Sequence, residues 1–412
     1  MRTPLRVTPL VVGLLVVSCG DATGPQPGDP ILGLPRDLSV AETKLVDADN
    51  RFALELFREI NRQEGDGNIF VSPLSVAMAL GMTYNGANGA TQEAMQQTLE
   101  LTDLSLEEVN QSYRDLIGLL VDLDPLVELL IANSIWYREG LTPEQAFLHA
   151  TQEYFDARVS ALDFSAPGAS GTINGWVRDN TKGLIEEIVP AVIPANIVMY
   201  LINAIYFKGD WTSQFDSDLT QAGPFTLASG SQTTADMMRH ADAAPVGYHR
   251  EEGVAIVDLP YGGRAFSMTV LLPDVPDGLD QLLESLTVEQ WTSWMAAIDS
   301  TDLVVSMPTF TLEYELTMND VLSALGMDVA FTPMADFTKM FAPGGIWIDE
   351  VKHKAVVQVD EEGTTAAAVT SVSMTDSAPM PFVVDRPFVF VIREQYSGTV
   401  LFMGKVMDPT AG

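Results

Sequence analysis

Cysteine and histidine are almost absent from this chain. Among 412 residues there is one cysteine, Cys19, and there are four histidines, His149, His240, His249 and His353. A single cysteine cannot form a disulfide within the chain, and no two of the histidines have the spacing of ligands to one metal ion. We therefore expect neither a disulfide framework nor a metal site, and no motif points to a cofactor.

Sequence motifs of the common enzymes are also lacking. The chain contains no Gly-x-Ser-x-Gly, His-Glu-x-x-His, Gly-x-x-x-x-Gly-Lys or Gly-x-Gly-x-x-Gly, the patterns of esterases, zinc proteases, nucleotide hydrolases and dinucleotide-binding enzymes. Acidic side chains are so frequent that composition leaves open a hydrolase with two catalytic carboxylates, but no pair stands out. The sequence therefore does not predict an enzyme.

Basic residues are few. The 22 lysines and arginines face 56 aspartates and glutamates, which gives a formal net charge of −34 at pH 7. A surface of this charge repels phosphate backbones and anionic membranes. We expect no nucleic acid or other polyanion as a partner, and solubility is the simplest reason for the acidity.

The apolar run at the N-terminus, Leu10 to Val17, is shorter than the roughly 20 residues of a membrane-spanning helix. It follows two basic residues and precedes Ser18-Cys19, as in a cleaved export signal. Residues 16–19 are similar to a bacterial lipobox, in which the cysteine becomes the lipidated first residue. We expect residues 1–18 to be a signal peptide and Cys19 to carry a lipid anchor, the only membrane contact.

The protein would then be exported, as a cell-envelope lipoprotein or an extracellular protein. An ordinary secretory signal with an incidental cysteine is the alternative. Residues 19–40 are rich in proline and glycine, which is typical of a flexible tether, and we assign residues 41–412 to one folded domain.

Periodicity within that domain changes along the chain. Helical spacing prevails in the first half and β-branched or aromatic runs in the second, so the predicted fold class is α+β. Helices are expected at 50–62, 72–82, 91–99, 105–121, 143–155, 171–187 and 279–298. Strands, several of them buried on both faces, are expected at 199–207, 254–259, 267–272, 303–310, 388–392 and 400–406.

One uncharged segment stands out near the C-terminus. Asp360-Glu361-Glu362-Gly363 ends a strand-like run and is followed by twelve small or β-tolerant residues, 364–375. Alternate side chains of such a segment can enter a sheet without burying a charge or a ring, and Gly363 allows a hinge. A loop that can become a strand and a disordered Ala/Thr-rich linker both fit this composition.

Seven sequence blocks resemble the serpin family, in the family's order. Residues 361–368 resemble the hinge of an inhibitory serpin's reactive loop, and residues 382–390, with Asp385-Arg386-Pro387-Phe388, resemble the signature that follows the loop. The other similar blocks are 68–75, 131–136, 174–183, 203–211 and 401–406. From about residue 45 to its end the chain is similar to an inhibitory serpin, and its N-terminus suggests a bacterial lipoprotein-like member.

The resemblance implies a fold of about eight or nine helices and three β-sheets, with an exposed reactive loop at about 361–381. It also implies a metastable suicide substrate. A protease cleaves the loop and is held as an acyl-enzyme while the loop inserts as a strand into the central sheet. The expected partner is a serine protease, or a cysteine protease, in a covalent complex with a monomeric inhibitor.

Site residues follow from the same resemblance. The hinge comprises Glu361, Glu362, Gly363, Thr364, Thr365, Ala366, Ala367 and Ala368. Polar residues of the family's shutter, where the central sheet opens, match Ser72, Ser75, Asn203 and His353. Trp211 matches the breach tryptophan, where insertion begins. None of these residues is expected to be catalytic.

Three positions are candidates for the scissile bond. Counting forward from Gly363 places it at Ser377-Ala378, which we prefer, whereas counting back from the signature places it at Asp376-Ser377. The serine fits elastase-like or subtilisin-like proteases and the aspartate an Asp-directed one. A bond at Met374-Thr375 fits chymotrypsin-like or elastase-like enzymes, and trypsin-like targets are not expected because no basic residue lies in the loop.

A non-inhibitory serpin, acting as a binding or chaperone protein, is the functional alternative. Such a protein is expected to carry charged, bulky or proline residues in the hinge. Residues 364–370 are instead small, which favours inhibition.

Overall fold

The computed structural model describes residues 30–363 and 380–411. Nine α-helices lie in these two segments. They are α1 (Val40–Glu64), α2 (Pro73–Tyr84), α3 (Gly89–Thr98), α4 (Leu106–Val121), α5 (Gln145–Phe155), α6 (Ala169–Asn180), α7 (Leu279–Ser285), α8 (Val288–Ala297) and α9 (Asn319–Leu322). Three single-turn segments accompany them: η1 (Ser217–Leu219), η2 (Ser323–Met327) and η3 (Asp328–Phe331). No helix within the described segments has both the length and the hydrophobicity needed to cross a bilayer.

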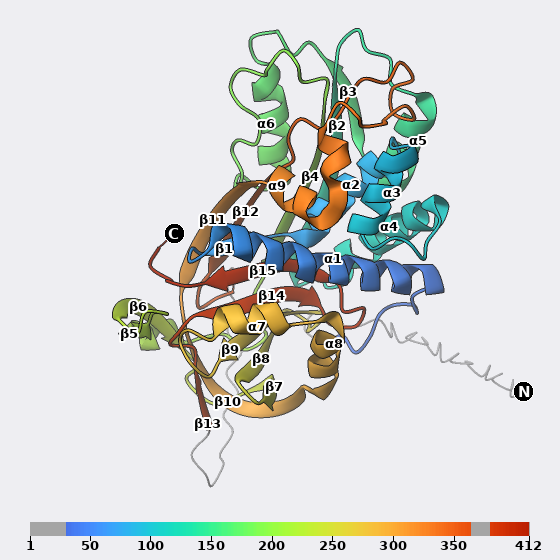
Figure 1. The fold of residues 1–412 in the computed structure, drawn as a ribbon. Helices are drawn as coiled ribbons and strands as arrows, with labels where there is room; N and C mark the ends of the chain where they lie inside the picture. Colours follow the sequence, from blue (N-terminus) through green and yellow to red (C-terminus); the bar gives the residue numbers. More distant parts are fainter. Residues whose placement is uncertain (1–29, 364–379, 412) are drawn as a thin grey trace, which may run out of the picture.

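Fifteen strands form three sheets in the described residues (Figure 1). They are β1 (Ile69–Val71), β2 (Val127–Arg138), β3 (Arg158–Leu162), β4 (Met199–Gly209), β5 (Gln221–Thr226), β6 (Gln232–Arg239), β7 (Ala244–Glu251), β8 (Val254–Tyr261), β9 (Phe266–Pro273), β10 (Asp299–Pro308), β11 (Phe310–Thr317), β12 (Lys352–Val359), β13 (Met380–Val383), β14 (Phe388–Glu394) and β15 (Val400–Val406). The predicted α+β class, with eight or nine helices and three sheets, is confirmed.

Side-chain caps explain where several helices begin. Ser39 and Ser105 each form a capping box with a glutamate three residues later, at the starts of α1 and α4. Ser72 caps α2 by accepting a hydrogen bond from the Ser75 amide, and Pro73 occupies the first turn, where its missing N–H costs nothing.

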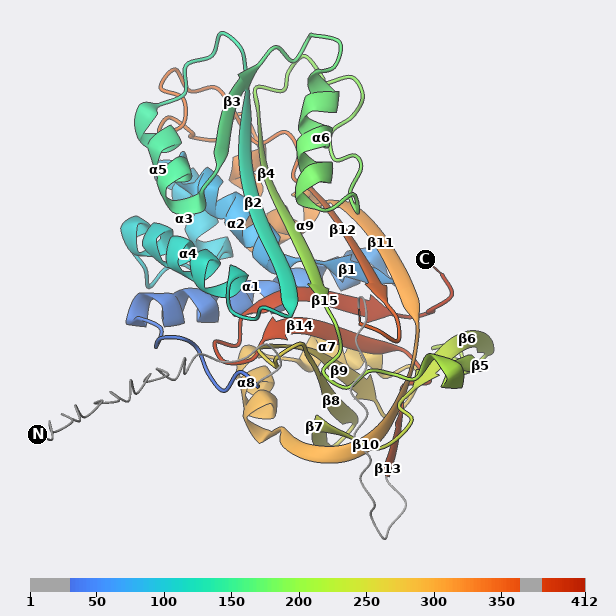
Figure 2. The same ribbon diagram turned by 180° about the vertical axis from the view of Figure 1, so that it is seen from behind.

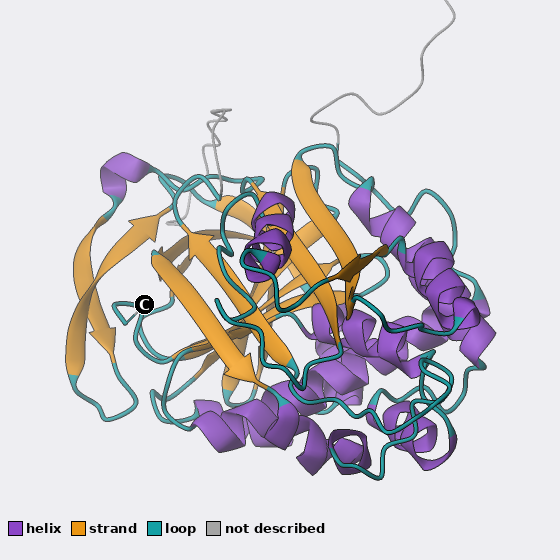
Figure 3. Cartoon of the chain, turned by 90° about the horizontal axis from the view of Figure 1, so that it is seen from above, coloured by secondary structure: helices purple, strands orange, loops and turns teal. Residues whose placement is uncertain are grey.

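The largest sheet holds ten strands in the order β1-β15-β14-β9-β8-β7-β10-β6-β5, with β13 paired to β10. Every residue of β8, β9, β14 and β15 is buried, as their uninterrupted apolar sequences predict. Most helices gather on one side of the strands (Figure 3). The main hydrophobic core lies between these helices and the sheets.

The two smaller sheets are β3-β2-β4 and β11-β12. Helix α2 packs on one face of β4, while α6 lies across the other face of β2 and β4 (Figure 2). A second apolar cluster, which includes Trp136, Ile173 and Ile202, lies beneath α6. The three-stranded sheet is therefore covered on both faces over β2 and β4, whereas alternate residues of β11 in the two-stranded sheet are exposed.

Two predicted helices end differently in the structure. The helix expected at 171–187 stops at Asn180, because Lys182 and Gly183 adopt positive φ values of 51° and 87° and turn the chain. The helix expected at 279–298 is two helices, since Leu286 is extended and Thr287 starts α8 by capping the Gln290 amide. Strands β1, β2, β3, β5, β6, β7, β11 and β13 were not predicted. Polar residues interrupt the apolar pattern of most of them, and β1 has only three residues.

Gly404 in β15 tests how tightly the core is packed. A Cβ atom at this position would lie 2.2 Å from the Phe390 ring, which stacks with Phe70 at 5.8 Å between ring centroids. Gly404→Ala should therefore lower the free energy of unfolding by about 1–3 kcal/mol, measured by urea titration. Gly118→Ala in α4 is the control: its Cβ meets no atom within 4 Å, so helix propensity should stabilise it by about 0.5–1 kcal/mol. Equal stability of both variants would contradict the packing.

Candidate functional site

Two strand edges face each other without pairing in the middle of the molecule. Among the described residues β4 pairs only with β2, and β12 pairs only with β11. A cavity of about 150 Å³ and a second of about 130 Å³ lie between β4 and β12. Ile185, Ile205 and Lys354 line both cavities, so the two are neighbours. We call this space the slot.

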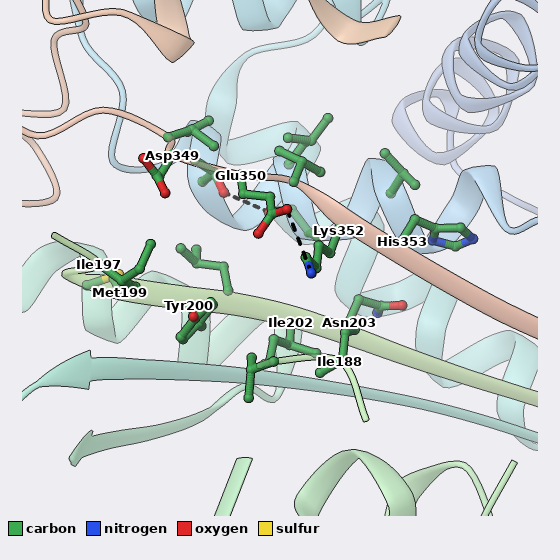
Figure 4. A pocket seen from close by; sticks show the side chains of 18 of the residues that line it. Ile188, Ile197, Met199, Tyr200, Ile202, Asn203, Asp349, Glu350, Lys352 and His353 are labelled. Carbon is green, nitrogen blue, oxygen red and sulfur yellow. Dashed lines mark hydrogen bonds and ion pairs between the residues drawn. The ribbon is translucent and has the colours of Figure 1, made fainter. Parts of the chain in front are cut away.

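The larger cavity of the slot is shown in Figure 4. Its walls are β4 and β12, its inner side is α2, and residues 185–190 after α6 and residues 346–351 before β12 complete it. Asn203 of β4 and His353 of β12 lie on opposite walls (Figure 4). Apolar side chains such as Ile202 and Met199 make up much of the lining.

Three of the four predicted shutter residues form one hydrogen-bonded cluster. The Ser72 amide donates to His353 Nε2 at 3.0 Å, the Ser72 hydroxyl donates to the Leu401 carbonyl at 2.8 Å, and the Ser75 amide donates to Ser72 Oγ at 3.2 Å. The cluster therefore links α2 and β15 to β12, the far wall of the slot.

Asn203 lies in the slot but outside this cluster. Its Nδ2 donates to Asn133 Oδ1 at 2.9 Å, across the β2–β4 ladder. Its Oδ1 is buried and has no hydrogen-bond partner among the described residues, which is costly in a packed interior.

His353 is buried, and burial lowers its pKa to about 4, because a charged imidazolium would lose its hydration there. The ring is therefore neutral at pH 7, and its Nε2 is free to accept the Ser72 amide hydrogen. Acid would charge the ring and break that bond.

Trp211 lies at the other end of the slot, beside the hinge. Its indole Nε1 donates to the Asp360 carbonyl at 2.9 Å, and its amide donates to the Glu362 carbonyl at 3.2 Å. Its ring stacks on Tyr261, with centroids 4.4 Å apart. Trp211 and Gly363 both line the smaller cavity, so the hinge begins where the slot ends.

Gly363 has no room for a side chain. Its φ is +86°, and a Cβ would lie 2.4 Å from the Trp211 nitrogen and 2.6 Å from the Gly209 carbonyl oxygen. Only glycine combines this conformation with so close an approach of the backbone. The chain therefore turns at Gly363 directly over the end of β4.

Acidic side chains surround the turn. The Thr220 hydroxyl donates to Glu361 Oε1 at 2.5 Å. The pKa of Asp360 is raised, mainly because the carboxyl is partly buried and further because the negative charges of Glu361 and Glu362 are nearby. On the far side of the loop, β13 pairs in parallel with β10, Met380 opposite Leu303. Both ends of the segment 364–379 are thus held by described residues.

Several predicted site residues lie outside the described segments. These are hinge residues Thr364, Thr365, Ala366, Ala367 and Ala368, scissile-bond residues Asp376, Ser377 and Ala378, and Cys19. No group of three or more metal-ligating side chains occurs in the part of the chain that is described.

Sequence reasoning missed four residues of this site. Asn133 lies in the serpin-like block 131–136, but no site role was predicted for it. Tyr261, Phe215 and Thr220 belong to none of the seven serpin-like blocks. Phe215 donates its amide to the Glu361 carbonyl at 3.1 Å. Nothing in the local sequence signals this contact, because the two residues are far apart along the chain.

Comparisons with known proteins agree with this geometry. The family model described as Serpin (serine protease inhibitor) matches residues 47–409. The leukocyte elastase inhibitor of Sus scrofa is 34% identical over 374 residues, covering 88% of this chain and 98% of that protein. The structure of human kallistatin matches with a TM-score of 0.81 at 25% identity, covering 91% of this chain and all of that one. Human thyroxine-binding globulin in complex with its ligand matches with a TM-score of 0.81 at 26% identity, covering 90% and 100%.

Titration of His353 gives a prediction for acid stability. Its pKa is about 4 in the folded chain and about 6.5 in an unfolded one, so its contribution is complete above pH 6.5 and is lost as the pH falls toward 4. Between pH 7 and pH 4, His353→Gln should therefore lose on the order of 3 kcal/mol less unfolding free energy than the wild type, measured by urea titration at each pH.

The exposed residue His149 of α5 provides the control. His149→Gln should lose as much stability in acid as the wild type does. An equal loss in His353→Gln and the wild type would show that the buried ring is not the group that titrates.

Proposed function

This chain belongs to the serpin family, and we propose that it inhibits serine proteases as a suicide substrate. The proposed targets are elastase-like, chymotrypsin-like or subtilisin-like enzymes, with cysteine proteases as a second class. The similarity to the leukocyte elastase inhibitor over 88% of the chain supports an inhibitory role.

The slot between β4 and β12 is the observation that carries the proposal. The 11 residues of β4 span about 36 Å, and the twelve uncharged residues 364–375 would span about 40 Å when extended. The segment has the length and the small side chains of a strand that fills the slot. Its backbone would pair with β4 on one side and β12 on the other, and each such hydrogen bond contributes about 1 kcal/mol net.

Cleavage would release the segment at one end only. In the proposed step the protease nucleophile attacks the Ser377 carbonyl, the Ser377-Ala378 peptide bond breaks, and the new amine at Ala378 takes up a proton. Ser377 remains esterified to the protease, or bound as a thioester for a cysteine protease. The β13–β10 ladder keeps the C-terminal part in place, while residues 364–377 become free to enter the slot.

Roles for the site residues follow from this proposal. Trp211 and Gly363 hold the point where insertion starts, and Ser72, Ser75 and His353 tie the slot's far wall to the body of the molecule. Asn203 would give its unpartnered oxygen to a backbone amide of the inserted strand. The protein itself contributes no catalytic group, and we propose that it acts as a monomer in a covalent complex.

We also propose that the protein is exported and held to a membrane by a lipid on Cys19. The sequence from Leu10 to Cys19 supports this anchor, with residues 1–18 as the signal peptide, 19–40 as the tether and 41–412 as the domain. A bacterial lipoprotein-like member is the type of serpin that fits it. Mass spectrometry of Cys19 after expression in a bacterial host would detect the lipid.

A charge in the hinge tests the insertion. Thr364→Arg would place an unpaired cation in the slot, which costs several kcal/mol, so insertion should lag behind hydrolysis of the acyl-enzyme. We expect the variant to be cleaved as a substrate without trapping the protease, as measured by denaturing gel electrophoresis. The control is Thr292→Arg at an exposed position of α8. Full inhibition by Thr364→Arg would exclude insertion at this residue.

A protease panel tests the proposed function itself. Incubation with elastase, chymotrypsin and subtilisin should give a complex that resists denaturation, and mass spectrometry should find a released peptide that begins at Ala378. A peptide beginning at Ser377 or Thr375 would move the scissile bond without changing the mechanism. Clean cleavage without a complex, for every protease tried, would instead favour a non-inhibitory binding or chaperone serpin.

A further inference from the structure

A row of four aromatic rings runs behind the hinge and ends at His240. Tyr261 stacks on Trp211 with centroids 4.4 Å apart, Trp211 meets Phe215 edge to face at 5.9 Å, and Phe215 stacks on His240 at 4.2 Å with an interplanar angle of 20°. The last pair is the closest of the three. His240 therefore packs nearly flat against the Phe215 ring.

This row reaches the hinge through two backbone hydrogen bonds. The Phe215 amide donates to the Glu361 carbonyl at 3.1 Å, and the Trp211 amide donates to the Glu362 carbonyl at 3.2 Å. A shift of the Phe215 ring moves the backbone that carries the first donor. The position of Glu361 thus depends on what holds that ring.

His240 also touches the other end of the loop, through its backbone. It directly follows β6, and its amide donates to the Val305 carbonyl in β10 at 3.0 Å. Val305 lies opposite Phe382 of β13 in the β10–β13 ladder. His240 is therefore linked to the hinge through its ring and to the strand after the loop through its main chain.

Burial of the His240 imidazole beside Phe215 costs free energy, because one of its ring nitrogens has no hydrogen-bond partner among the described residues. The residue is 2% exposed, its Nε2 bonds the Ser213 carbonyl at 3.1 Å, and its Nδ1 is buried with no partner among the described residues. Burial lowers its pKa to about 4, so the ring is neutral at pH 7. Ser213 lies two residues before Phe215, so the ring holds the same short segment by stacking and by a hydrogen bond.

We propose that His240 is a positioning residue of the inhibitory reaction, which orients Phe215 and so holds Glu361–Gly363 in register with the slot. The inference rests on the proposed inhibitory function and adds to it a residue that no sequence motif singles out. Insertion competes with hydrolysis of the acyl-enzyme, and a misplaced hinge delays only insertion. Loss of the ring should therefore change how many inhibitor molecules each protease consumes, and not how fast the loop is cleaved.

The first test compares three variants in the stoichiometry of inhibition at pH 7.5. His240→Ala removes the stack and should raise the inhibitor consumed per protease roughly 2- to 10-fold, the factor that corresponds to one aromatic pair. His240→Phe keeps a flat ring against Phe215 and should restore most of the wild-type value. Leu283→Ala removes a buried side chain of α7, which belongs neither to the row of rings nor to the hinge, and should lower stability without changing the stoichiometry.

Amide hydrogen exchange provides a second test that needs no protease. In His240→Ala the amides of Trp211 and Phe215 should exchange roughly tenfold faster than in the wild type, since the hinge carbonyls no longer stay in place. Amides of β14 should be unchanged, and His240→Phe should resemble the wild type.

The outcomes separate the inference from the function on which it rests. If the wild type traps no protease, the inhibitory function fails, and so does this proposal as a step of inhibition. If the wild type traps its target and His240→Ala does so with the same stoichiometry, only the role of His240 is overturned. Wild-type exchange at Phe215 in His240→Ala would overturn the contact-based argument directly.

Discussion

The structure depends on a slot that no strand fills. The edges of β4 and β12 face each other without a ladder between them in the described residues, and open strand edges are sites where another strand can add. Here the missing strand is proposed to come from the same chain, where the segment 364–379 is held at both ends. In this proposal the intact molecule would retain the free energy that pairing releases, and a kinetic barrier would keep it there.

The surroundings of the slot serve to delay and then guide that pairing. Helices α2 and α6 pack on opposite faces of β4, one wall of the slot. The Ser72–His353 hydrogen bond ties β12 to the body of the molecule, and the row of rings from Tyr261 to His240 holds the hinge at the entrance. Asn203 lines the larger cavity of the slot, and its buried Oδ1 has no hydrogen-bond partner among the described residues.

Much of this fold could be predicted from sequence periodicity, because burial and periodicity are local properties. The strands at 254–259 and 388–392 occur as predicted, each with a continuous apolar pattern. The helix predicted at 50–62 is also present, but it begins ten residues earlier, at Val40, because Ser39 caps it. The helix at 279–298 was predicted as one element because its break at Leu286 and Thr287 depends on a cap, not on hydrophobicity. The site could not be derived in this way: Ser72 and His353 are 281 positions apart, and only the family resemblance placed them together. Phe215 and His240 carry no such resemblance, so their contact with the hinge appeared only in the structure.

Thermal unfolding before and after cleavage of the loop tests the central claim most directly. If the cleaved segment fills the slot, its hydrogen bonds to β4 and β12 and its buried side chains should raise the melting temperature of the nicked chain well above that of the intact one. An unchanged or lower melting temperature after a single cut between residues 370 and 379 would show that the slot does not accept the loop.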